Sequence, residues 1–372
     1  MKLVVSSSGL LKGMTTVSKA LPIKTDEAIL ENFLFDLKGD SLKITASDEK
    51  ITLTTEVPVQ NTIEEGKIAV PARYLINLIK EFSDQPLTIS TTLENSFEIV
   101  SEGGNYNFPY NNPDDYPNIA TPGETAISVE IPSESLAEGI NSTVYAASDE
   151  DNRPIMNSIF FDITPDTTTL VASDLQKLVC YMVDDLKSEQ EASFILNSRH
   201  ALALRSILGK DETVTIRFDG NVAVFSFGST TAICNLVVGK YPAYKSIIPQ
   251  NNSNILTISR VQFLSTVRRI ANCSPKSSNH IRFDLRPGEF GISAQDTGFE
   301  IAGKEVLTCS YEGDELSIGF KSTHLIEMLS NLSCETVVMK FADRRRAALM
   351  LPSEDEAASE KVFGIVMPVM VR

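Results

Sequence analysis

The sequence lacks the residue patterns that most enzymes and metal sites require. Its three histidines, His200, His280 and His324, stand in neither HExxH nor HxE spacing. The phosphate-binding patterns GxxxxGKS/T and GxGxxG do not occur either. We therefore expect no catalytic residue, no cofactor and no metal ion.

Paired cysteines and long apolar runs are also missing. The five cysteines are scattered without a CxxC pair, at Cys180, Cys234, Cys273, Cys309 and Cys334. This odd number favours reduced, mostly buried thiols in a cytoplasmic protein. No segment approaches the roughly 18 consecutive apolar residues of a membrane span, and the apolar run in MKLVVSSSGLLKGMTTV is too short for a secretory leader. We expect a cytoplasmic protein with no membrane partner.

Basic residues are outnumbered: 33 lysines and arginines stand against 49 aspartates and glutamates, a formal net charge of −16. This balance argues against a protein coated in basic residues for nucleic acid, although it leaves room for a local basic lining.

The 372 residues exceed what one hydrophobic core normally spans, so two or three domains are expected. The 42% hydrophobic and 22% charged residues are typical of folded domains.

What the sequence does contain is a threefold internal repeat. The segments FLFDLKGDSLKITASDEKITLTTEV, IFFDITPDTTTLVASDLQKLVCYMV and IRFDLRPGEFGISAQDTGFEIAGKEV align. Each has an aspartate after an aromatic residue and a second aspartate at a constant offset, namely Asp36 and Asp48, Asp162 and Asp174, Asp284 and Asp296. Recurrence in all three copies indicates strand ends and turns, where aspartate bonds its own backbone, and not a metal or acid–base site. The repeat predicts domains at 1–122, 126–250 and 254–372.

Each copy follows the same order of secondary structure. Apolar residues spaced by three or four predict a first helix at about 10–21, 136–144 and 261–271. Strand-like runs such as SLKITAS and ITLTTEV follow. A second amphipathic helix is predicted at about 72–82, 198–208 and 322–332. The pattern is typical of an α+β fold with an antiparallel sheet and both helices of each copy on one face.

The repeat, with DDYPNI closing the first copy, KYPAYKSIIP closing the second and VMPVM near the end of the chain, resembles the bacterial DNA polymerase III beta subunit (beta sliding clamp) family over the whole chain. In that family three DNA-clamp-type domains form half of a closed ring, with sheets outside and helices lining a hole around duplex DNA. The resemblance implies a non-catalytic processivity subunit. Its implied partners are double-stranded DNA, a second copy bound head to tail, the replicative polymerase, the clamp loader and repair polymerases. The alternative is a cytoplasmic peptide-binding repeat scaffold that does not encircle DNA.

The resemblance also implies a patchy basic lining. Sequence-independent phosphate contacts weak enough to permit sliding suit such a ring. Glu134 and Glu138 interrupt the lining on the first helix of copy two, and the alternative for each basic residue is an ordinary solvated position. The positions implied to face DNA are Lys12, Lys19, Lys24, Arg73, Lys80, Arg153, Arg199, Arg205, Lys210, Arg260, Arg268 and Arg269.

Head-to-tail closure needs two different surfaces, one on each partner. The family pattern selects an edge strand and second helix of the first domain against the third domain, here Leu78, Phe82, Tyr106 and Phe108 facing Ile270 and Cys273. Tyr106 and Phe108 alternate at strand spacing, so both side chains should project from one face. The alternative is that both are core residues of copy one.

A further implication is an apolar pocket between the second and third domains that receives a short peptide from each partner. Methionines and exposed apolar walls suit varied guests. The end of the chain is predicted to divide near Val366, with a core strand before it and a pocket wall after it. The implied lining is Met156, Ser173, Leu175, Gln176, Lys177, Leu178, Pro242, Ser246, Ile247, His324, Ile365, Val366, Met367, Pro368, Val369 and Met370.

The pocket departs from the family pattern. The family usually has Thr-Asp-Gly-His-Arg-Leu where this chain has SDLQKL at residues 173–178, and Ser246 stands where arginine is common. A leucine in place of glycine should reshape the groove, and the missing histidine and arginine remove polar anchors. We expect a pocket tuned to a somewhat different peptide.

Overall fold

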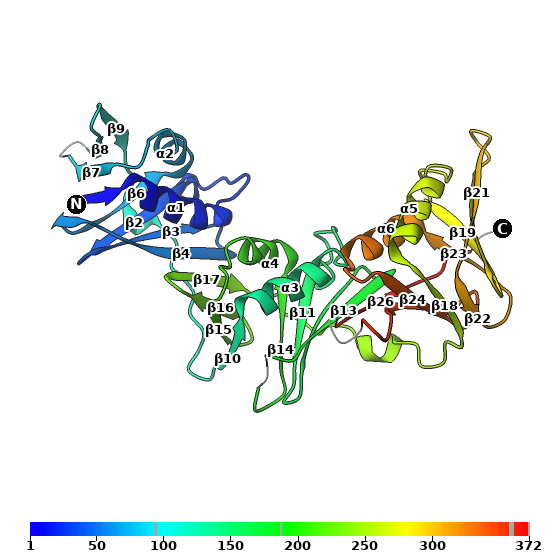
Figure 1. The fold of residues 1–372 in the computed structure, drawn as a ribbon. Helices are drawn as coiled ribbons and strands as arrows, with labels where there is room; N and C mark the ends of the chain where they lie inside the picture. Colours follow the sequence, from blue (N-terminus) through cyan, green and yellow to red (C-terminus); the bar gives the residue numbers. More distant parts are fainter. Residues whose placement is uncertain (93–94, 187, 357–360, 371–372) are drawn as a thin grey trace. The chain divides into compact units, whose positions relative to one another are not determined.

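The computed structural model describes residues 1–92, 95–186, 188–356 and 361–370. Residues 357–360, which are part of the acidic loop PSEDEAASEK, and the final residues 371–372 therefore lie outside the described part. The chain divides into two compact units, Met1–Glu134 with Leu202–Leu236, and Ser135–Ala201 with Val237–Arg372 (Figure 1). No helix in the described ranges is long and apolar enough to cross a membrane.

The first unit contains two antiparallel sheets. One has the order β5-β1-β7-β8-β9, formed by β1 Lys2–Ser6, β5 Asn61–Glu64, β7 Pro86–Thr91, β8 Ser96–Val100 and β9 Asn105–Pro109. The other has the order β10-β15-β16-β17-β4-β3-β2-β6, formed by β2 Asn32–Lys38, β3 Ser41–Ser47, β4 Ile51–Pro58, β6 Gly66–Pro71, β10 Ile127–Pro132, β15 Thr213–Phe218, β16 Val222–Phe227 and β17 Thr230–Asn235.

Helices α1 Ser7–Val17 and α2 Ala72–Ile79 belong to the first unit. Ser6 caps α1, since its hydroxyl accepts a hydrogen bond from the Gly9 amide at 3.3 Å. The helix buries its apolar stripe, including Leu10, Met14 and Val17, against β3 and β4. Gly13 lies so close to Val57 that a Cβ atom there would collide with it, so glycine permits this close packing.

The second unit also contains two antiparallel sheets. The larger has the order β14-β11-β12-β13-β26-β25-β24-β18-β22, formed by β11 Ser158–Ile163, β12 Thr168–Ser173, β13 Lys177–Val183, β14 Ala192–Asn197, β18 Asn254–Ser259, β22 Ser310–Glu312, β24 Thr336–Phe341, β25 Ala348–Pro352 and β26 Val362–Val366. The smaller has the order β21-β20-β19-β23, formed by β19 His280–Arg286, β20 Glu289–Asp296, β21 Ile301–Leu307 and β23 Leu316–Lys321.

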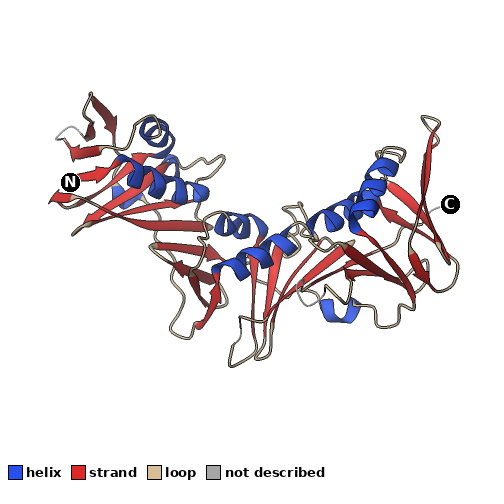
Figure 2. Cartoon of the chain, in the orientation of Figure 1, coloured by secondary structure: helices blue, strands red, loops and turns tan. Residues whose placement is uncertain are grey.

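Helices α5 Arg260–Ala271 and α6 Ser322–Asn331 pack against each other in the second unit. An aromatic cluster fixes α5 on the smaller sheet, where the Phe263 ring centroid lies 5.7 Å from Phe283 and 5.5 Å from Phe290. The remaining helices, α3 Ser133–Val144 and α4 Ser198–Arg205, each contain a boundary between the two units. Figure 2 shows the helices α1, α2, α5 and α6 on one side of the sheets of their own unit.

The predicted α+β class and the two helices per copy are confirmed. The second helices end at Ile79, Arg205 and Asn331, a little before the predicted limits, because apolar residues continue into the turns that follow. The compact units do not coincide with the three repeats. Strand β17 of copy two pairs with β4 of copy one, and β13 of copy two pairs with β26 of copy three, so each large sheet joins strands of two copies.

Candidate functional site

An apolar cavity of about 490 Å³ lies in the second unit. Five parts of the chain form it: the segment before β11, the turn before β13 with the start of β13, the segment around the short 3-10 helix Tyr244–Ile247, the residue before β25, and the end of β26 with Met367. Its lining is Met156, Ser173, Leu175, Gln176, Lys177, Leu178, Tyr241, Pro242, Ala243, Tyr244, Ser246, Ile247, Ala347, Ile365 and Met367.

The cavity wall rests on a packed aromatic support. The rings of Phe160 and Tyr241 stack with centroids 4.8 Å apart. The Tyr244 hydroxyl donates a hydrogen bond of 2.7 Å to Oδ2 of Asp162, which also pairs with Lys245 Nζ at 2.8 Å. Burial and this carboxylate raise the pKa of Tyr244, so the phenol stays protonated and keeps donating. The wall is therefore preorganised.

The turn at residues 173–177 forms one edge of the cavity. Asp174 Oδ1 accepts hydrogen bonds from the amides of Gln176 at 2.8 Å and Lys177 at 2.7 Å. The Ser173 hydroxyl accepts from the Leu175 amide at 3.0 Å and donates to the Lys177 carbonyl at 2.8 Å. The turn predicted from the repeated aspartate is thus present, and the side chain of Asp174 holds it.

A buried ionic cluster fixes this turn to α6. Lys177 is 6% exposed, and its Nζ lies 2.9 Å from Asp174 Oδ2 and 2.9 Å from Glu327 Oε2. His324 Nε2 lies 3.5 Å from the same Asp174 oxygen. Burial alone would lower the pKa of Lys177, but hydrogen bonds to Glu327 and Asp174 outweigh it and raise that pKa. The ammonium therefore stays charged within the protein.

Two further members of this cluster, Asp174 and His324, have lowered pKa values. Burial alone would raise the pKa of Asp174, but the Lys177 ammonium and backbone amides outweigh it and hold that pKa below its usual value. Burial lowers the pKa of His324 to about 4, since the attraction of Asp174 is partly cancelled by Lys177 and Lys321. At neutral pH a neutral imidazole therefore lies beside the Lys177 ammonium and the Asp174 carboxylate.

Most of the predicted pocket residues line this cavity, and five do not. His324 lies in the ionic cluster beside the turn, and Val366 is fully buried in the core. The Val369 amide donates a 2.8 Å hydrogen bond to the Gly319 carbonyl, which carries the tail away after Met367. Pro368, Val369 and Met370 consequently do not line the cavity. The predicted division of the tail near Val366 agrees with the end of β26, but only Met367 of the tail forms the wall.

Four lining residues were not predicted: Tyr241, Ala243, Tyr244 and Ala347. The signal for the two tyrosines was present in KYPAYKS, where aromatic residues three apart flank Pro242. Ala347 gives no signal in sequence, because it reaches the cavity only through the pairing of β25 with β26.

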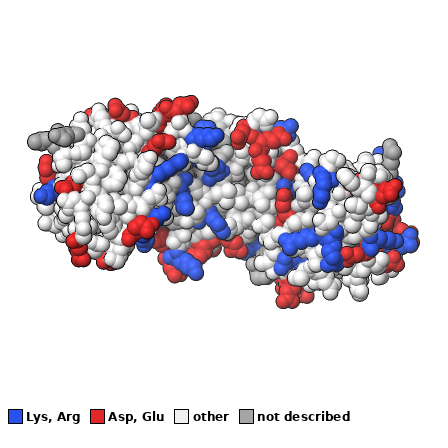
Figure 3. All heavy atoms as spheres, turned by 90° about the horizontal axis from the view of Figure 1, so that it is seen from above, with Lys and Arg blue, Asp and Glu red and all other residues white. Residues whose placement is uncertain are grey.

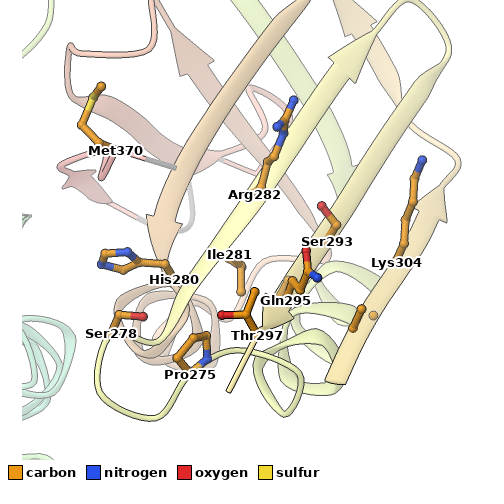
Figure 4. Close-up of a pocket in the computed structure, with 13 residues that line it drawn as sticks. Pro275, Ser278, His280, Ile281, Arg282, Ser293, Gln295, Thr297, Lys304 and Met370 are labelled. Carbon is orange, nitrogen blue, oxygen red and sulfur yellow. The ribbon is translucent and has the colours of Figure 1, made fainter. Parts of the chain in front are cut away.

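A second, more polar cavity of about 680 Å³ lies on the smaller sheet of the same unit. Figure 4 shows that His280, Arg282, Ser293 and Lys304 come from three neighbouring strands and Met370 from the tail. The predictions from sequence did not include this surface. Arg282 is already paired with Asp284 at 3.0 Å and donates to the Ser317 hydroxyl at 3.1 Å.

The basic residues expected to face DNA divide into exposed and engaged groups. Exposed side chains in the first unit are Lys12, Lys19, Lys24, Arg73, Lys80, Arg205 and Lys210. Arg73 also donates to the Pro22 carbonyl at 3.1 Å, and Lys80 pairs with Glu81 at 3.8 Å. In the second unit Arg153 pairs with Glu150 at 3.2 Å, Arg199 is exposed, and the exposed Arg268 donates to the Ser330 hydroxyl at 3.1 Å. In Figure 3, which looks onto the helix side, basic and acidic residues are interspersed.

Two arginines of α5 have intramolecular roles. Arg260 Nε donates to the Cys334 carbonyl at 2.6 Å and its Nη1 to the Leu329 carbonyl at 3.1 Å, so it binds the end of α6. Arg269 forms two hydrogen bonds to Glu305 of β21, at 2.8 and 2.6 Å. Arg260 was predicted to face DNA, but its guanidinium instead binds backbone carbonyls of its own unit.

The residues expected at a head-to-tail contact lie near two sheet edges. Tyr106 and Phe108 of β9 are half-buried, with Tyr106 against Phe82 at 5.6 Å and Phe108 against Phe97 at 5.5 Å. Leu78 is half-buried on α2, where Tyr74 one turn earlier is exposed and was not predicted.

The opposing surface differs from the prediction at one residue. Ile270 is 2% exposed, so it packs inside its own unit and cannot provide contact area. Cys273 is half-buried beside Gly303 of β21. Exposed apolar area comes instead from Phe299, Ile301 and Val306, on or next to β21. Sequence reasoning did not select these residues, because the position of a strand at the end of a sheet depends on long-range pairing.

Family comparisons agree with this architecture. Models of the DNA polymerase III beta subunit match in succession, the N-terminal domain at residues 1–120, the central domain at 130–243 and the C-terminal domain at 245–368. The chain belongs to the DNA polymerase III beta subunit family. It is therefore a beta sliding clamp in function, a non-catalytic processivity subunit of DNA replication.

Individual relatives are distant but match over full length. The beta sliding clamp of Haemophilus influenzae is 24% identical and that of Vibrio cholerae 25%, each match covering 99% of this chain and 100% of the relative. The crystal structure of the Pseudomonas aeruginosa beta subunit superposes with a TM-score of 0.95 at 24% identity, and the Bacillus subtilis sliding clamp with 0.92 at 21%. Both structural matches cover 100% of each chain.

Proposed function

We propose that two copies of this clamp close head to tail into a ring that encircles double-stranded DNA without reading its sequence. The full-length match to the sliding-clamp family carries this proposal. The exposed lysines and arginines on helices supply sequence-independent phosphate attraction, and the interspersed acidic residues keep it weak enough for sliding. The three domains would correspond to residues 1–122, 126–250 and 254–372. We place the protein in the cytoplasm, where its five free cysteines remain reduced.

The decisive test is topological. Labelled protein is loaded onto a nicked circular plasmid with its cognate clamp loader, and bound protein is separated by gel filtration. Encirclement predicts retention on the circle and release when the same DNA is linearised, because a ring slides off an end. A peptide-binding scaffold that does not encircle DNA would co-elute with neither form, and a conventional DNA-binding protein would remain on both.

We further propose that the 490 Å³ cavity binds a short apolar peptide segment of the replicative polymerase, the clamp loader and repair polymerases. Leu175, Ile247 and Met367 are exposed at its wall although they are large and apolar. Each apolar side chain that a guest buries fully contributes roughly 1.5–3 kcal/mol. Partners can therefore exchange at moderate affinity on one site.

A peptide titration tests the docking site. The probe is a fluorescein-labelled octapeptide with an adjacent leucine and phenylalanine between serines, followed by anisotropy. The double variant Ile247→Ala, Met367→Ala should weaken binding about 10-fold, because both truncated side chains line the cavity. Met182→Ala is the matched control, since Met182 is a partly exposed methionine outside the cavity. Equal affinity of the double variant and the control would refute docking here.

A further inference from the structure

The internal repeat places two copies of one turn in different surroundings. In copy one, Asp48 Oδ1 accepts from the amides of Lys50 at 3.1 Å and Ile51 at 2.8 Å, and the Ser47 hydroxyl accepts from the Glu49 amide at 3.1 Å. The turn at residues 173–177 has the same bonds at the same offsets. The two turns are thus matched in backbone, and their differences lie in side chains.

Both turns place a non-glycine residue in the left-handed region. Glu49 has φ 69° and Leu175 has φ 75°. This conformation is strained for any residue with a Cβ atom, and it persists where the surroundings determine it. Glu49 is polar and solvated, as expected for a turn. Leu175 is apolar and 57% exposed, so packing within the chain does not account for it.

The chain holds Leu175 in place from both sides. On one side Lys177 connects the turn to Asp174 and to Glu327 of α6, whereas the matched residue in copy one is the buried apolar Ile51. On the other side the Met367 amide donates a 2.8 Å hydrogen bond to the Gln176 carbonyl. The exposed leucine is therefore fixed in the wall of the apolar cavity, which Met367 also lines.

We infer that Leu175 is a specificity-determining residue of the cavity, which packs against an apolar guest side chain flanking the anchor pair of the bound peptide. The inference rests on the proposed docking function and names the guest that this chain prefers. A strained, exposed leucine held beside an apolar cavity adds contact area that only an additional apolar guest residue can cover. Peptides with a polar residue at that flanking position bury no apolar side chain against Leu175, so their affinity does not increase.

Three labelled octapeptides test the inference by anisotropy. All contain the leucine–phenylalanine pair; the first has serine on both sides, the second has leucine before the pair, and the third has leucine after it. Wild-type protein should bind one of the two leucine-flanked peptides about 5-fold more tightly than the serine peptide, as expected for a partly buried leucine. In Leu175→Gly and Leu175→Ala this preference should vanish, so that the serine peptide and the leucine-flanked peptides bind with equal affinity.

Two comparisons separate lost contact from altered folding. Leu175→Gly relieves the left-handed strain and should raise the unfolding temperature by about 2 °C, while Leu175→Ala keeps the strain and should not. Glu49→Gly, in the matched turn, should stabilise similarly and leave peptide binding as in wild type.

The outcomes distinguish the role of Leu175 from the proposed docking function on which that role rests. Equal binding of all three peptides to wild type, or a preference that survives in Leu175→Gly, overturns the role of Leu175 alone. Binding of none of them overturns the docking proposal, and the role of Leu175 with it.

Discussion

At the residue scale, His324 makes the stability of the clamp depend on pH. Its imidazole is 5% exposed and its pKa falls from 6.5 to about 4, chiefly through burial. A histidine whose folded pKa lies below its unfolded pKa stabilises fully above the unfolded value, and the contribution is lost as the pH falls from about 6.5 toward 4. The unfolded chain binds the extra proton in that window.

We therefore predict that His324→Gln weakens the acid sensitivity of the protein. Glutamine stays neutral, so the variant should lose less stability than wild type between pH 7 and pH 5. The difference should be on the order of 1–2 kcal/mol, measured as the free energy of unfolding in urea at the two pH values. Parallel pH curves for the two proteins would show that His324 is not the group that titrates. The Asp174 carboxylate acts below this window, since its pKa is lowered.

Contacts of individual side chains were the features that the sequence predicted least well. The second aspartate of each copy, at Asp48, Asp174 and Asp296, lies at a turn as predicted, and its side chain accepts hydrogen bonds from amides two and three residues away. The first aspartates, Asp36, Asp162 and Asp284, lie within strands instead. The buried ion pairs of Lys177 and the carbonyl contacts of Arg260 could not be predicted, because lysine and arginine side chains are usually exposed. Their partners, Glu327, Cys334 and Leu329, lie far along the chain and become neighbours only in the folded unit.

At the scale of elements, Arg260 connects the beginning of α5 to the end of α6. A cation at a helix C-terminus satisfies free carbonyls and interacts favourably with the helix dipole. We predict that Arg260→Ala lowers the free energy of unfolding by about 1–2 kcal/mol in urea titrations. Arg268→Ala on the same helix should change it by less than about 0.5 kcal/mol, because Arg268 is exposed. Equal effects of the two substitutions would contradict a capping role for Arg260.

The elements themselves were largely predictable. Periodic apolar residues located both helices of every copy, and VFGIV was correctly interpreted as a core strand because its residues are apolar and continuous. The pairing of strands across copies was not predictable. It depends on contacts between β17 and β4 and between β13 and β26, which are more than a hundred residues apart in the chain. The cavity wall at Ala347 follows from the same long-range pairing.

At the scale of the whole molecule, the proposed head-to-tail assembly would depend on two sheet ends within the described chain. Strand β9 ends the five-stranded sheet and β21 ends the four-stranded sheet. An uncovered edge strand offers backbone groups for pairing with another chain. Exposed Ile301 and Val306 on β21, and half-buried Tyr106 and Phe108 on β9, supply the apolar side chains that such a head-to-tail contact would bury.

The last prediction concerns that contact. Ile301 and Val306 are 45% and 57% exposed, so Ile301→Lys with Val306→Lys should leave the fold and unfolding temperature unchanged. Desolvating two ammonium groups in place of two apolar side chains should raise the dimer dissociation constant on the order of 100-fold. Sedimentation velocity across a concentration series measures it, with Val238→Lys as a control at another exposed valine. An unchanged dimer would place ring closure away from β21, whereas a monomer that no longer stays on nicked circles would connect this edge to encirclement.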